Sequence, residues 1–239
     1  MTAALRFHAR SAVRVTAVVM FAVAVSSTRL RAQDIVYAAS LSDLDSVTQA
    51  VLGREIARAR DRGLPVEPLV AKVREGRLKR APALLIRAAV ERLRERLSAA
   101  REALGATSSP EELTAGADAI AAGAQGASLR AVRAATTQSV TAPIGALAQL
   151  LASGVAEAKA VDMVVGLLRR NASPALLVAL GNLVEADVAT GLLPNASAAF
   201  RLRALEGVLN GTVTTDAAAA NINAGAAGNG PASPPRRKP

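Results

Sequence analysis

The chain contains no cysteine and no tryptophan, and its single histidine, His8, lies near the N-terminus. The absence of cysteine excludes disulfides, a thiol nucleophile and a lipid anchor attached through a cysteine thioether. Beyond position 8 the usual general base and the usual nitrogen ligand for zinc are both missing. A histidine-based catalytic triad and a conventional zinc site are therefore excluded for the remainder of the chain.

The remaining side chains offer little other chemistry. Glu111 and Glu112 are adjacent, but they stand in the first turn of an expected helix, where acidic residues favour the backbone dipole. Glu185 and Asp187 lie about 200° apart around a helix, so they cannot face one substrate together. The sequence shows no phosphate-binding loop, no serine-lysine motif and no acidic calcium loop. It predicts a protein that is not an enzyme and uses no metal or cofactor.

The first 32 residues have the pattern of a bacterial signal peptide. Arginines and no acidic residues precede an apolar run over 15–25, and a polar stretch ends at Ala32. This run is shorter than the roughly 20 residues that span a bilayer. We expect cleavage near Ala32, or alternatively after Ser26, and a periplasmic or secreted location. A buried amphipathic helix is the alternative interpretation of this segment.

The C-terminal 212–239 segment consists mainly of alanine, asparagine, glycine and proline and ends in basic residues. Such a composition cannot bury enough apolar surface to fold, so it predicts a disordered tail. Between the two ends, 33–211 is expected to form a single domain.

Apolar residues in 33–211 recur at spacings of three and four, which predicts an all-α fold. The clearest case is the row from Ile86 to Leu104, spaced 4, 3, 4, 3, 4. Ser109, Pro110 and Glu112 form a specific helix-start signal, because serine caps, proline suits the first turn and glutamate returns a bond. The expected helices cover 42–63, 65–76, 82–104, 110–123, 143–154, 161–168 and 174–191, with short ones around 129–132 and 200–205.

Glycines divide this helical region in a regular way. Gly63, Gly123, Gly154 and Gly191 each follow an expected helix and precede an apolar residue and a second helix. The intervals from Gly123 to Gly154 and from Gly154 to Gly191 are 31 and 37 residues, the length of a two-helix repeat. The pattern leaves two architectures open, a short solenoid of two-helix units and an irregular helical bundle.

The net charge of +10 is unevenly distributed. Five of the 29 basic residues and none of the 19 acidic ones lie in the first 32 residues, which leaves +5 for the rest of the chain. Within 54–101 there are 14 basic and 6 acidic residues. The candidate anion-contact residues of this stretch are Arg74, Arg77, Lys79, Arg80, Arg87, Arg92, Arg94 and Arg96.

Two functions are compatible with these observations. The first is an exported, soluble, non-catalytic module that binds or scaffolds another protein. The second is a binder of anionic envelope material, whether glycan, lipid headgroup or nucleic acid, through 74–96. Nucleic acid is disfavoured because Tyr37 and Phe200 are the only aromatic residues after position 32.

Overall fold

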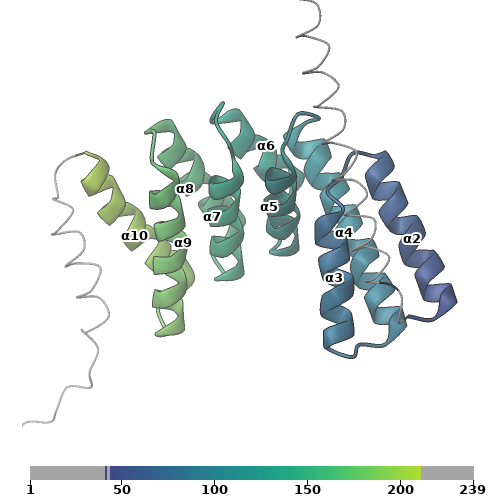
Figure 1. The fold of residues 1–239 in the computed structure, drawn as a ribbon. Helices are drawn as coiled ribbons and strands as arrows, with labels where there is room; N and C mark the ends of the chain where they lie inside the picture. The colour runs from purple at the N-terminus through teal and green to yellow at the C-terminus, as the bar shows by residue number, and fades with distance from the viewer. Residues whose placement is uncertain (1–40, 42–43, 211–239) are drawn as a thin grey trace, which may run out of the picture. The chain divides into compact units, whose positions relative to one another are not determined.

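The computed structural model describes residue 41 and residues 44–210, and these residues form helices and connecting turns with no strand among them (Figure 1). The predicted all-helical class is confirmed. The predicted signal peptide and the predicted tail lie outside the described residues. The helices are α2 (Ser46–Asp61), α3 (Glu67–Leu78), α4 (Ala83–Leu104), α5 (Pro110–Ala121), α6 (Gly126–Ala134), α7 (Thr141–Ala152), α8 (Glu157–Arg169), α9 (Pro174–Ala189) and α10 (Pro194–Leu209).

Several helix boundaries agree with the start signals in the sequence. Ser109 caps α5, with Glu112 returning a bond to the backbone of Ser109, so the predicted capping box is present. Ser173 caps α9, and its hydroxyl accepts a hydrogen bond from the Leu176 N–H at 3.3 Å. Both helices place proline immediately after the capping serine, where its missing N–H costs nothing.

Among the boundaries that differ from the sequence prediction, two have a clear structural reason. α2 begins at Ser46, and the carboxylate of Asp45 accepts a hydrogen bond from the Thr48 N–H at 2.9 Å, as a capping residue does. Ser42, the predicted first residue, lies outside the described residues. α3 continues through Gly76 to Leu78, because Gly76 lies against Ile86 of α4: a Cβ added there would stand 2.7 Å from Ile86 Cγ1.

The chain divides into two units. Residues up to 56 and 67–90 belong to one, and 57–66 and the residues from 91 onward belong to the other. Helices α5 to α10 all lie in the second unit.

Helices α5 to α10 form three successive hairpins, α5–α6, α7–α8 and α9–α10. α7 packs extensively against both α5 and α9, while α8 contacts α6 and α10 (Figure 1). Odd-numbered and even-numbered helices therefore form separate rows, and each hairpin rests on the next.

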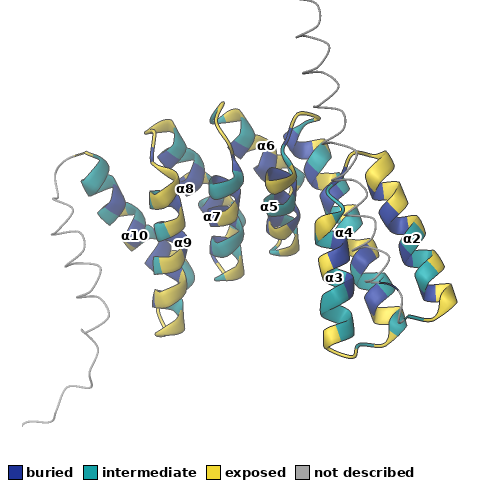
Figure 2. Cartoon of the chain, in the orientation of Figure 1, coloured by how far each residue is buried: buried dark blue, intermediate teal, exposed yellow. Residues whose placement is uncertain are grey.

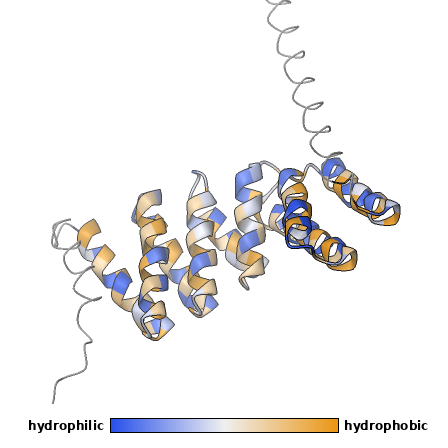
Figure 3. Ribbon diagram, turned by 60° about the horizontal axis from the view of Figure 1, so that its bottom comes forward, coloured by the Kyte–Doolittle hydropathy of each residue, from blue (hydrophilic) through white to orange (hydrophobic). Residues whose placement is uncertain are grey.

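The core of these hairpins consists of aliphatic side chains. Leu113, Leu129, Leu147 and Leu180 are fully buried, and the buried positions follow one face of each helix (Figure 2). The C-terminal helices are coloured mainly hydrophobic or intermediate in Figure 3, and α7 contains no charged residue.

Small residues let these helices approach closely. A Cβ added to Gly116 of α5 would lie 2.8 Å from the Cβ of Ala100 in α4, and one added to Gly181 of α9 would overlap the Gln149 side chain of α7. Gln149 donates hydrogen bonds to Asn182 and Glu185 across the same contact. Close approach compensates for the small area that each alanine and glycine buries.

The four dividing glycines end their helices in the same way. Gly63, Gly123, Gly154 and Gly191 have positive φ, and the N–H groups of each glycine and its successor bond back to the helix it ends. In the turn at Gly154, for example, Gly154 N–H bonds to Leu151 O at 2.9 Å and Val155 N–H to Leu150 O at 3.0 Å. This pair of bonds satisfies carbonyl groups that would otherwise lack partners.

A buried ion pair joins the last two helices. Asp187 of α9 accepts hydrogen bonds from Arg201 Nε at 2.8 Å and from the Ser197 hydroxyl at 2.6 Å, and Arg201 Nη2 lies 2.5 Å from its other oxygen. Arg201 is only 3% exposed. The hydrogen bond from Arg201 lowers the pKa of Asp187 although burial opposes the shift.

Replacing Gly123 with alanine should destabilise the fold by about 1 kcal/mol, because alanine is strained at φ +109° even though the added methyl group meets no atom. The matched control is Gly145→Ala in α7, where the space is also open but the backbone is helical. That control should stabilise the protein by about 0.5–1 kcal/mol. Urea unfolding measures both changes, and equal effects would contradict the turn assignment.

Candidate functional site

The predicted anion-contact residues of the first unit lie around the connection from α3 to α4. Lys79 and Arg80 are exposed, and Arg74, Arg77 and Arg87 are half-buried. Arg74 Nη1 lies 3.7 Å from the Glu67 carboxylate, and Lys79 Nζ lies 2.6 Å from that of Glu75. Arg80 has a positive φ of 52°, which turns the chain between the two helices.

The predicted residues of the second unit all lie on α4. Arg92 is exposed and Arg96 is half-buried, whereas the Arg94 side chain is only 12% exposed and lies 3.5 Å from Glu95. On a helix Arg92 and Arg96 are separated by about 40°, and Arg94 is about 160° from either of them. These three arginines therefore do not share one face, and anion contact by the full set of eight stays a prediction.

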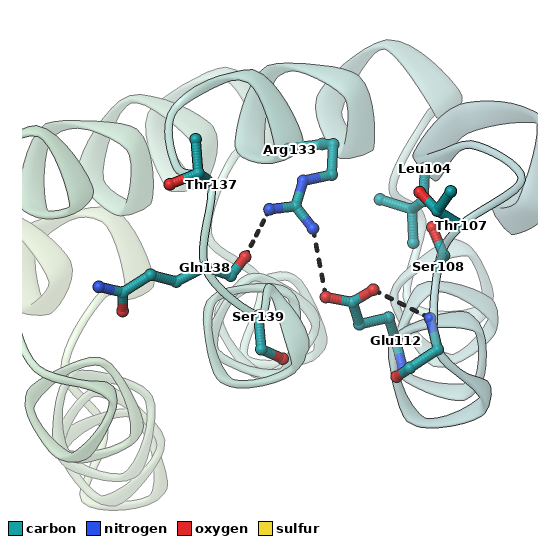
Figure 4. Close-up of a pocket in the computed structure, with 9 residues that line it drawn as sticks. Leu104, Thr107, Ser108, Glu112, Arg133, Thr137, Gln138 and Ser139 are labelled. Carbon is teal, nitrogen blue, oxygen red and sulfur yellow. Dashed lines mark hydrogen bonds and ion pairs between the residues drawn. The ribbon is translucent and has the colours of Figure 1, made fainter. Parts of the chain in front are cut away.

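A polar pocket of about 430 Å³ lies between α5, α6 and the segment leading to α7 (Figure 4). Hydroxyl-bearing side chains dominate its lining, and Leu104 is its one aliphatic residue. The lining residues are Leu104, Thr107, Ser108, Ser109, Glu112, Arg133, Thr137, Gln138 and Ser139.

Glu112 lines this pocket and accepts hydrogen bonds from three different parts of the chain. Its carboxylate accepts hydrogen bonds from the Ser109 N–H at 3.1 Å and from Arg133 Nη1 at 3.2 Å (Figure 4). It also accepts one from the Val140 N–H at 2.9 Å. Arg133 also donates to the backbone carbonyl oxygens of Thr136 and Gln138. One carboxylate thus joins the start of α5, the start of α7 and the end of α6.

The hydrogen bonds stabilise the charged form of Glu112. Burial by itself would raise the pKa of this carboxyl group, but the bonds from Val140 and Ser109 and the charge of Arg133 outweigh burial and lower it. Glu112 is therefore ionised at neutral pH, with both oxygens engaged. The hydroxyl of Ser108 is buried and has no hydrogen-bond partner among the described residues.

Two more helix starts are joined across hairpins. Glu157 of α8 accepts hydrogen bonds from the Gln125 N–H at 2.7 Å and the Ser128 hydroxyl at 2.6 Å, at the start of α6. Asn195 of α10 accepts one from the Ala156 N–H at 3.1 Å, at the start of α8. Each of these acceptors lies in the first turn of the next even-numbered helix.

Large apolar side chains are exposed in groups at two places, and singly at Val47 of α2 and Val178 of α9. The first is the α3–α4 connection, where Leu78 is 86%, Leu84 66% and Leu85 58% exposed. The second is α10 and the turn before it, where Leu193 is 75% and Phe200 52% exposed. Exposed apolar groups of this size often mark contact surfaces.

Within the described residues there is no cluster of three or more acidic, histidine or cysteine side chains able to hold a metal ion. Nor does that part of the chain contain a helix whose length and apolar character would let it cross a bilayer. A scan against protein-family models, a search of curated proteins and a search of solved structures each found no match.

The sequence indicated some of these features and not others. The motif Ser109-Pro110-Glu112 predicted the cap on α5, but nothing nearby indicated that the same carboxylate reaches Val140. Phe200 and Leu84 each belong to a helix with apolar spacing, which normally predicts burial. The sequence did contain a signal for the exposure of Leu78, Leu84 and Leu85. These leucines flank a proline, in a stretch with four basic and no acidic residues.

Replacing Glu112 with glutamine should destabilise the protein by about 2–3 kcal/mol, because the amide removes the negative charge opposite Arg133 and replaces one of the two acceptor oxygens with an NH₂ group. Because the pKa of Glu112 is lower in the folded chain, its contribution is present above the ordinary value of 4.5 and is lost as pH falls through the folded value. Unfolding between neutral pH and acid should show a weaker pH dependence for Glu112→Gln.

The matched control for this variant is Glu111→Gln, on an exposed neighbour in the same turn. This control should change stability little. Equal losses in both variants would show that the cap, and not the buried bridge, is responsible.

Proposed function

We propose that this protein is an exported, non-catalytic interaction module, a short solenoid of two-helix units that binds a partner protein through α10. Export is supported by the signal-peptide pattern of residues 1–32, which implies a periplasmic or secreted location. The stacked hairpins support the solenoid, because each hairpin contacts mainly its neighbours.

Phe200 carries the proposal. It is the only aromatic residue among the described residues, and it is 52% exposed while the core is filled with leucine, valine and alanine. A ring would contribute more apolar area to this core than any residue that occupies it. Its place on the surface supports a role in contact, since aromatic residues dominate the energetics of protein interfaces.

The surroundings of Phe200 favour a rigid anchor. The Arg201 guanidinium carbon lies 5.4 Å from the ring centroid, and Arg201 is itself fixed by Asp187. Arg203, three residues after Phe200, shares its side of α10, and the exposed Leu193 lies immediately before the helix. A groove lined with apolar groups and bearing an acidic rim would complement this surface.

The start of α10 provides additional support. The residues preceding α6 and α8 donate their N–H groups to the side chains of Glu157 and Asn195. Leu193 precedes α10 in the same way, but within the described part of the chain no side chain accepts a hydrogen bond from its N–H group. α10 is the last described helix of its row. A partner that continues the stack would supply a carboxylate or amide oxygen here.

Contact with anionic envelope material is a second candidate function. It is favoured by the exposed Lys79 and Arg80 at the α3–α4 connection, although the nearly buried Arg94 does not contribute an exposed charge. Charge-driven contact of this kind weakens with salt, whereas an apolar contact at α10 hardly responds.

The test is capture from an envelope extract with the exported protein as bait, using wild type, Phe200→Ala and Leu78→Ser. A partner bound through α10 should survive a high-salt wash with wild type and with Leu78→Ser, and should be lost with Phe200→Ala. With the purified partner, Phe200→Ala should weaken the dissociation constant at least about 10-fold.

Both substituted residues are exposed, so thermal unfolding should show that both variants retain the wild-type fold. Equal capture by all three proteins would overturn the α10 assignment. Self-association of wild type that Phe200→Ala abolishes would replace the partner with a second copy of this chain.

A further inference from the structure

The connection between α3 and α4 is a rigid corner with an unusual surface. Arg80 N–H bonds to Arg77 O and Ala81 N–H to Gly76 O, both at 2.9 Å, so the turn is held by the same pair of bonds as the glycine turns. α4 begins at Ala83, immediately after Pro82. Near the turn, Gly76 of α3 packs against Ile86 of α4, and this contact holds the two helices together. The residues of the corner therefore have a fixed scaffold.

Three leucines project from this corner into solvent. Leu78 ends α3, and Leu84 and Leu85 lie in the first turn of α4. All three are more than half exposed, while the adjacent Ile86 is only 3% exposed. Soluble proteins rarely gather large aliphatic side chains at one exposed turn without a partner.

The same corner is strongly basic. The segment 76–90 contains Arg77, Lys79, Arg80 and Arg87 and no acidic residue. Glu75, just before it, is bracketed by Lys72 and Lys79, each with Nζ 2.6 Å from a carboxylate oxygen. Hydrogen bonds from Lys72 and Lys79 lower the pKa of Glu75 to about 2. The one negative charge of Glu75 is outnumbered by the cations around it, so the corner keeps an excess of positive charge.

We propose that the α3–α4 corner docks on an anionic lipid surface, with Leu78, Leu84 and Leu85 entering the acyl boundary and Lys79 and Arg80 contacting lipid phosphates. The inference rests on the second candidate function, names its ligand, and is independent of the partner at α10. Apolar tips surrounded by cations match the two layers of such a surface, apolar below and anionic above.

Other polyanions fit this corner less well. A nucleic acid would be expected to stack on aromatic side chains, and the described residues up to 90 contain none. A soluble anionic glycan would bind the cations but would leave the three leucines in water.

The test uses the full chain and vesicles of phosphatidylcholine with and without phosphatidylglycerol. Because the chain contains no tryptophan, Leu84→Trp places a single reporter in the corner, and Val47→Trp, at an exposed site in α2, is its matched control. The Leu84→Trp emission should shift to the blue and be quenched by brominated lipid only when phosphatidylglycerol is present. The Val47→Trp emission should remain unchanged. A local reporter separates docking of the corner from any binding by the apolar run at 15–25.

Two double variants separate the contributions of the corner in vesicle sedimentation. Leu78→Ser with Leu85→Ser should lower the partition coefficient at least about 10-fold. Lys79→Gln with Arg80→Gln should lower it by a similar factor in low salt and by much less in high salt. Both pairs are carried in the Leu84→Trp protein, so that quenching and sedimentation are read together.

The lipid assignment would be overturned by a Leu84→Trp emission that does not respond to phosphatidylglycerol. Binding to dextran sulfate without binding to vesicles would retain the second candidate function and reject lipid as its ligand. No binding to either would reject both. A blue shift that depends on protein concentration without lipid would assign the corner to self-association and overturn the proposal.

Discussion

The N–H groups at helix starts are the constraint on which the rest of this structure depends. The helices from α5 onward are 9 to 16 residues long, so a large share of their backbone groups lies at the ends. Among these helices, only α5 and α9 have an N-cap residue whose own side chain accepts a hydrogen bond from the first turn. The starts of α6, α7 and α8 depend instead on Glu157, Glu112 and Asn195, each supplied by a different hairpin. Side chains that satisfy backbone groups thus also set how one hairpin lies on another.

Large apolar side chains lie both in the core and on the surface of this protein. Gly116 and Gly181 allow close approach at single points, and leucines such as Leu147 and Leu180 fill the rest of the core. The ring of Phe200 and the leucines at the α3–α4 corner lie outside this core. Their exposure is the strongest indication of where other molecules bind.

The sequence predicts the helices well because their signals are local. Ser109-Pro110, Ser173-Pro174 and the dividing glycines act within one turn, and the structure agrees at each of them. The continuation of α3 past Gly76 depends on Ile86 in the next helix, and the bond from Val140 to Glu112 joins residues 28 apart. Such contacts leave no local pattern. The exposure of Phe200 is a similar case, because apolar spacing does not distinguish a buried face from a face that awaits a partner.

The bonds at the starts of α6 and α8 also have a direction. Each acceptor belongs to the later hairpin, so α6 depends on Glu157 of α8, and α8 depends on Asn195 of α10. Fraying of α10 would release the start of α8, and loss of α8 would release the start of α6. Local unfolding of the even-numbered row should therefore spread from α10 through α8 to α6, whereas the start of α7 depends on Glu112 of the earlier hairpin. A contact that stabilises α10 therefore also stabilises the starts of α8 and α6.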